Sequence, residues 1–377
     1  MLDGKDWDEA LAKEILEANK PTFALIEKGL ACREFQVPEA KTIYDKIPYV
    51  FDFMQMARLM QLHTSDLATR DLGREAVERT LDVVSFGYRI ECAKGGPVNW
   101  LVGRTIKGMG LEQLRRLVIE CKVPAETLQA VAVRLTAWED SATGLAYALR
   151  CEYQMDMNMI DEVYLTGLPF QSFVTSLGDK PPKPSWYERL KVRLFLRPNK
   201  TKGMFAESIR TIIEDCAKHY DAFHPWPVAR QVPYGMPLDL TSNNSTGRML
   251  YQMVIPAITG GLSMKCQTQT DVAATRAIVA LKAFKMKTGR LPKALDELVP
   301  EYLAAVPLDD FDGKPLRYSP EKKILYSVGK DLKDVGGSTK EEAIKWWHKE
   351  NTGRPPEDAP VDPPGLNFPN PSWPIEF

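Results

Sequence analysis

The amino-acid sequence has 377 residues, a formal net charge of −1 and an ordinary globular composition, with 44% hydrophobic and 26% charged residues. This length is more than one hydrophobic core usually supports, which predicts two domains, and the balanced charge gives no reason to expect a nucleic-acid partner. No run approaches the roughly 20 apolar residues of a membrane-spanning helix, and the charged residues at 3–9 do not fit a signal peptide, so we expect a soluble chain.

The first half of the chain shows helical periodicity. Apolar side chains recur at helical spacing, beginning with Phe53, Met56, Ala57 and Met60. The same spacing returns within residues 77–88, 111–118, 128–138 and 141–164, with short turn segments between the stripes. We therefore predict helical hairpins over residues 1–177, arranged either as a solenoid-like stack or as an irregular bundle.

Residues 178–268 form the second predicted region. Prolines at 181, 182 and 184 exclude a helix interior there, and helices are expected at about 185–196 and 203–223. The proline-containing stretch 224–244 is expected to be irregular and to wrap over the helical body, because Trp226 and Leu238 need burial.

A cluster of cationic side chains occupies residues 183–202, within and around the first predicted helix of this region, and only Glu188 opposes it. Its members are Lys183, Arg189, Lys191, Arg193, Arg197, Lys200 and Lys202. One interpretation is an anion-binding patch for phosphates, lipid headgroups or an acidic partner. The other is a solvated basic face, with Trp186, Tyr187 and Phe195 on the buried face of the same helix, and the pattern favours this second interpretation.

Residues 269–337 predict a small α+β module. A helix over 271–284 runs towards a stop at Gly289, a short helix covers 295–299, and strands are expected at 315–319 and 324–328. The remainder, 338–377, is expected to be a short helix and an extended proline-rich tail that docks either on its own domain or on a partner.

Three short motifs of this module resemble the C-terminal half of the major pseudopilins of type II secretion systems. They are Gly289-Arg290-Leu291-Pro292, Asp310-Phe311-Asp312-Gly313-Lys314-Pro315 and Tyr326-Ser327-Val328-Gly329-Lys330-Asp331. The resemblance implies a bacterial cell-envelope or periplasmic protein, and relatives of this kind usually carry an N-terminal membrane anchor. We hypothesise that such an anchor precedes Met1 and would be the route of any membrane association. The long helical region ahead of the module does not fit a filament subunit.

The resemblance also implies a calcium site in the loop 329–337. Asp331 and Asp334 would supply two of the six to eight oxygen ligands that calcium takes. The alternative is a solvated turn whose aspartates accept hydrogen bonds from nearby backbone amides, and the adjacent Lys330 and Lys333 favour it. No other cofactor is indicated.

The remaining candidates for chemistry are weak. Asp309, Asp310 and Asp312 are expected to set a turn before a strand, and the four histidines to be structural or surface residues. The six cysteines form no Cys-x-x-Cys pair, and no standard catalytic motif occurs.

The sequence thus favours a non-enzymatic scaffold or binding protein with protein partners. Two alternatives stay open: the anion-binding module described above, and an enzyme. The enzyme would use a carboxylate site in a groove of the helical domain, drawn from Glu152, Asp156 or Asp161 on the predicted helix 141–164.

Overall fold

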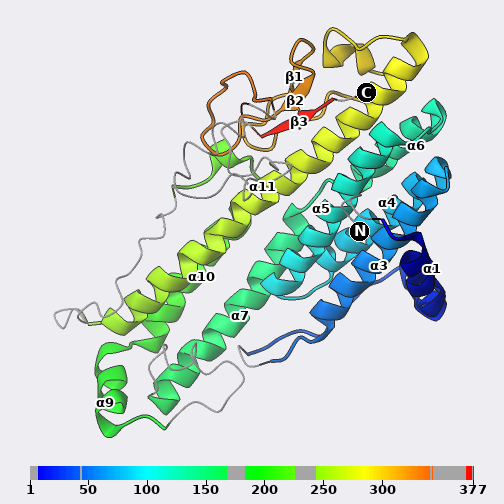
Figure 1. The fold of residues 1–377 in the computed structure, drawn as a ribbon. Helices are drawn as coiled ribbons and strands as arrows, with labels where there is room; N and C mark the ends of the chain where they lie inside the picture. Colours follow the sequence, from blue (N-terminus) through cyan, green and yellow to red (C-terminus); the bar gives the residue numbers. More distant parts are fainter. Residues whose placement is uncertain are drawn as a thin grey trace.

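The structure is a computed structural model and describes residues 7–42, 45–167, 183–225, 243–339, 342, 371–375 and 377. These residues form a mainly α-helical protein with a small three-stranded antiparallel sheet near the C-terminus (Figure 1), which confirms the predicted class. The choice between a solenoid and a bundle stays a prediction. Most of the predicted break at 178–184, the wrapping stretch 224–244 and the proline-rich tail lie outside the described residues.

The helices follow one another along the chain, and the connections between those within residues 49–166 are short. They are α1 (Glu9–Ala18), α2 (Lys20–Ala31), α3 (Tyr49–Thr69), α4 (Gly73–Cys92), α5 (Pro97–Glu120), α6 (Ala125–Leu135), α7 (Ala142–Thr166), α9 (Trp186–Phe195), α10 (Pro198–Asp215) and α11 (Ser245–Thr288). The described residues also form the 3₁₀ turns η1 (Thr136–Trp138), η2 (Tyr220–Ala222) and η3 (Leu295–Leu298). The predicted stripes lie in these helices; in α3 and α4, for example, Met60, Val77 and Leu81 are buried.

Helices α4 and α5 pack closely because glycines occupy their contact. A Cβ atom on Gly87 would lie 2.7 Å from the carbonyl oxygen of Gly103, and one on Gly103 would lie 2.7 Å from the Cα of Glu91. Beside this contact the fully buried Lys107 forms an ion pair with the fully buried Glu91, at 2.5 Å. The Lys107 ammonium also donates to the Ser141 hydroxyl at 2.7 Å, which ties α5 to the start of α7.

Helix α11 is much longer than the sequence pattern predicts. It contains 44 residues, or about 66 Å at 1.5 Å per residue, whereas the apolar pattern predicts helix only over 271–284. Pro256 lies inside the helix and does not end it, and the Thr259 hydroxyl donates to the Pro256 carbonyl at 3.0 Å. The helix runs from the end of the molecule near α9 to the end near the sheet, passing residues 268 and 269 without a break (Figure 1). The predicted domain division at that point stays a prediction.

The sheet consists of β1 (Arg317–Ser319), β2 (Ile324–Tyr326) and β3 (Ser372–Pro374), in the order β1-β2-β3. Its central strand is buried, and Leu325 lies opposite Tyr318 on one side and Trp373 on the other. The Trp373 indole donates to Asp271 of α11 at 3.0 Å, and Ile375 enters the main core. The described part of the tail therefore docks on its own chain.

No helix in the described parts of the chain is both long enough and apolar enough to cross a membrane.

Candidate functional site

Helix α9 begins with a capping box. The Ser185 hydroxyl accepts a hydrogen bond from the Glu188 amide at 3.3 Å, and the Glu188 carboxylate accepts from the Ser185 amide at 2.7 Å. These backbone and side-chain hydrogen bonds hold the pKa of Glu188 below its ordinary value. The box fixes the helix start directly after Pro184, as expected of a serine followed three residues later by a glutamate.

One narrow side of α9 attaches it to the body of the protein. Val192 and the following Leu196 are buried in a core that also contains Phe205 of α10. At the C-terminal end, the Arg197 amide donates to the Asn244 side-chain oxygen at 2.8 Å. Gly167, at the end of α7, packs so closely that a Cβ atom there would lie 2.6 Å from the Cγ of Arg189. These contacts fix which side of α9 faces outward.

The outward side of α9 is apolar. Exposed fractions are 77% for Trp186, 52% for Tyr187, 45% for Leu190 and 53% for Leu194. The prediction that Trp186 and Tyr187 lie on the buried face is therefore wrong, and Phe195 is only partly buried. Helix α9 carries two apolar stripes, one around Val192 and Leu196 and one around Trp186, Leu190 and Leu194. A helix attached along one narrow side can bury only one of them, and this was the signal available in the sequence.

Cations flank the exposed stripe on both sides. At 3.6 residues per turn, the four exposed apolar residues span an arc of about 100°, with Arg189 and Arg193 beyond one edge and Lys191 beyond the other. The Lys191 ammonium lies 4.4 Å from the centroid of the Tyr187 ring. None of these three cations forms an ion pair with a described residue. We call the four apolar residues and these three cations the α9 face.

The structure divides the rest of the predicted basic patch. Lys183, Arg197 and Lys200 are exposed, and the Arg197 guanidinium donates to the Asn243 side chain at 3.0 Å. Lys202 pairs with Asp161 of α7 at 2.6 Å, so its charge is partly neutralised. Three of the seven cations therefore belong to the α9 face, and the anion-binding role of the whole patch stays a prediction.

The predicted calcium ligands lie in the loop after β2. The Asp331 carboxylate accepts from the Lys333 amide at 3.3 Å, and the Asp334 carboxylate accepts from the Gly336 amide at 2.9 Å. The Arg317 guanidinium lies 3.7 Å from the other oxygen of Asp334. Hydrogen bonds of this kind belong to the alternative interpretation of this loop, and the described residues contain no group of three or more acidic, histidine or cysteine side chains suited to a metal. The calcium site stays a prediction.

The acidic cluster before β1 organises the module, as the sequence indicates. Buried Asp309 accepts from the amides of Phe311 and Val328 at 3.1 and 2.9 Å. The Asp309 carboxylate also forms an ion pair with the Arg317 guanidinium at 3.1 Å, and Asp312 pairs with the same guanidinium. Asp310 instead forms an ion pair with the ammonium of buried Lys265 in α11, at 2.7 Å. No local sequence pattern predicts this contact.

Two half-exposed histidines, His219 and His224, contact buried carboxylates. His219 contacts Asp310 through Nδ1 at 2.8 Å, and His224 contacts Asp215 through Nδ1 at 2.7 Å. His63 lies elsewhere, with its ring centroid 5.1 Å from that of Phe23, and burial lowers its pKa. These three have the structural or surface roles expected of them, and His348 lies outside the described residues.

The structure separates the three carboxylates of the enzyme hypothesis. Burial, with a smaller effect from Glu152, raises the pKa of Asp156 to about 8, and burial also raises the pKa of Glu152. Asp156 is 5% exposed, and its Oδ2 atom has no hydrogen-bond partner among the described residues. Asp161 instead points to Lys202 at the surface. Only Glu152 and Asp156 are close enough to influence each other.

Asp156 predicts a specific pH dependence of stability. Between about pH 4, where an unfolded aspartate titrates, and about pH 8, the folded state keeps a proton that the unfolded state releases, so stability falls as the pH rises through this window. We expect Asp156→Asn to unfold at higher urea at about pH 8, with a gain on the order of 5 kcal/mol, and to gain only about 1 kcal/mol at about pH 4.5. Asp161→Asn serves as the exposed control. A gain that is equal at both pH values would contradict the prediction.

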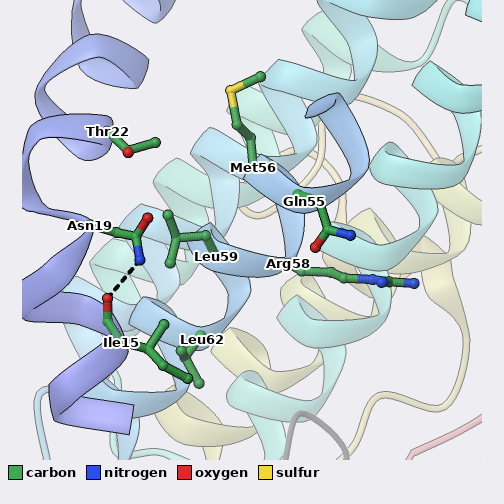
Figure 2. Close-up of a pocket in the computed structure, with 8 residues that line it drawn as sticks. All are labelled: Ile15, Asn19, Thr22, Gln55, Met56, Arg58, Leu59 and Leu62. Atoms are coloured by element: carbon green, nitrogen blue, oxygen red, sulfur yellow. Dashed lines mark hydrogen bonds between the residues drawn. The ribbon is translucent and has the colours of Figure 1, made fainter. Parts of the chain in front are cut away.

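A pocket of about 400 Å³ lies between the α1–α2 junction and α3. Figure 2 shows Ile15 and Asn19 facing Leu59 and Leu62, and Arg58 supplies the charge in its lining. The lining contains no carboxylate, histidine, cysteine or serine. The pocket can accommodate a small molecule, but its lining offers the Thr22 hydroxyl without a carboxylate or histidine beside it to act as a base.

The chain matches no protein-family model, and no curated protein or solved structure matches it either.

Proposed function

We propose that this protein is a non-enzymatic binding or scaffold protein and that the α9 face is its binding surface. One observation supports this most strongly: Trp186, Tyr187, Leu190 and Leu194 lie together on one helix and are exposed to between 45% and 77%. Contiguous exposed apolar side chains bordered by charges are typical of interaction sites, because leaving them in water is unfavourable unless a partner covers them.

The proposed location is the bacterial cell envelope or periplasm. It rests on the pseudopilin-like motifs around Gly289, Asp310 and Tyr326 alone. The calcium role of Asp331 and Asp334 rests on the same resemblance and is proposed with it.

An enzyme is the second candidate function, and the raised pKa of Asp156 favours it. A carboxyl group that is protonated near neutral pH can act as a general acid. We place this candidate second because Asp156 is almost completely buried and Asp161 does not join it.

Site-directed photocrosslinking in cells tests the binding function even though the partner is unidentified. A photoreactive amino acid at Leu190 should give crosslinked product, because its side chain would lie inside the contact. Val133 of α6, which is 70% exposed and carries an apolar side chain of similar size, is the matched control position. We expect several-fold more product from position 190.

A further inference from the structure

The shape of the α9 face limits what can cover it. Helix α9 lies at the end of the molecule opposite the sheet (Figure 1). Tyr164 and Leu165, at the end of the α7 helix that contacts α9, are also exposed. The apolar surface is therefore the outer side of a projecting helix, which fits against a broad apolar layer.

The charges specify that layer further. Arg189 and Arg193 border the apolar arc on one side and Lys191 borders it on the other, and none forms an ion pair with a described acidic side chain. Glu188 belongs to the capping box. With the whole chain at −1, this local positive charge is complementary to an anionic surface that meets both edges of the helix at once.

The side-chain types distinguish a lipid surface from other anionic partners. A helix in the plane of a membrane interface places tryptophan and leucine in the acyl region and lets the long stems of arginine and lysine carry their charges to the headgroups. Nucleic acid would use the aromatic rings and the cations, but it has no use for Leu190 and Leu194 at the centre of the arc.

From these features we infer that α9 docks in the interface of an anionic membrane, with Trp186, Leu190 and Leu194 inserted and with Arg189, Lys191 and Arg193 at the phosphates. This inference rests on the proposed binding function and names the partner of the same face. It places membrane contact at residues 186–194, whereas the sequence placed membrane association at an upstream anchor and offered lipid headgroups as one of several partners of the cationic cluster.

Vesicle co-sedimentation of the intact chain tests the inference. We expect binding to phosphatidylcholine vesicles that contain phosphatidylglycerol, and much weaker binding to phosphatidylcholine alone. Leu190→Ser combined with Leu194→Ser should weaken binding about tenfold or more, because the variant loses two aliphatic side chains that the wild type would bury in the membrane. Lys191→Gln combined with Arg193→Gln should weaken it about fivefold per cation and reduce its dependence on salt.

The control combines Leu25→Ser and Val133→Ser, which remove two apolar side chains that are more exposed than Leu190 and Leu194 and lie far from α9 along the chain, and it should leave binding unchanged. All six substituted side chains are exposed or partly exposed, and equal circular dichroism spectra would verify folding. The inference is overturned if the wild type binds neutral and anionic vesicles alike, or if the Leu190 and Leu194 substitutions change nothing. Photocrosslinks from position 190 to a protein in the absence of vesicle binding would overturn the lipid partner and leave the binding function standing.

Discussion

Replacing Lys265 by methionine is expected to lower the free energy of unfolding by about 3–5 kcal/mol. The Lys265 ammonium is buried in α11, where it donates to the Asp310 carboxylate and to the Lys218 carbonyl, both at 2.7 Å. Methionine keeps the volume but leaves the buried Asp310 carboxylate with the His219 ring as its remaining side-chain partner. An incompletely compensated buried charge is strongly destabilising. Urea unfolding of the intact chain measures the loss.

The double variant Lys265→Met, Asp310→Asn separates this effect from a simple packing defect. Asp310→Asn removes the carboxylate charge that Lys265→Met leaves without its ammonium partner. The double variant should therefore be more stable than Lys265→Met alone. If the single variant loses less than about 1 kcal/mol, Lys265 does not link α11 to the module in the way the 2.7 Å contacts indicate.

Replacing Gly87 by alanine is expected to destabilise the protein by about 3 kcal/mol or more. The added methyl group would meet the backbone of α5 at Gly103 and Lys107, and backbone atoms cannot move aside as the end of a side chain can. Separating α4 from α5 to make room would also disturb the buried Lys107–Glu91 ion pair beside the contact. Thermal or urea unfolding measures the effect.

Gly108, in the same helix α5, is the matched control. A Cβ atom there would meet nothing within 4 Å, so Gly108→Ala should raise stability by up to about 1 kcal/mol through helix propensity alone. The two substitutions should therefore have opposite signs. Equal effects at Gly87 and Gly108 would show that the close approach of α4 and α5 does not exist in solution.

Helical periodicity predicted much of the fold because it depends on local spacing. The stripe at residues 53–60 lies in α3, and the order helix, short helix, strand, strand over 269–337 is the order observed. The turn role of Asp309 was also predictable, since its acceptor contacts include the amide of Phe311, two residues away.

The length of α11 could not be read from the same pattern. Pro256 and the neighbouring glycines at 260 and 261 indicate an interruption by local rules, yet the helix continues through them. On either side of these residues, Ile255 and Leu262 are completely or nearly completely buried, and packing of this kind overrides weak local preferences. Long-range burial decides here, and a single sequence does not show it.

The cations of the α9 face were predicted as a candidate patch, but its exposed apolar side was missed for a related reason. Both apolar stripes of α9 are visible in the sequence, but only the contacts of Val192 with distant core residues decide which one is covered. The Lys265–Asp310 pair joins residues 45 positions apart and likewise has no local signal.

The photocrosslinking comparison between positions 190 and 133 tests the proposed function most directly. We expect crosslinked product in excess at position 190, and we expect it to disappear when Trp186 and Leu194 are both replaced by serine, because the rest of the contact would be lost. Product that is equally abundant at Val133, or absent from position 190 in a folded chain, would contradict the assignment of the α9 face as the binding surface.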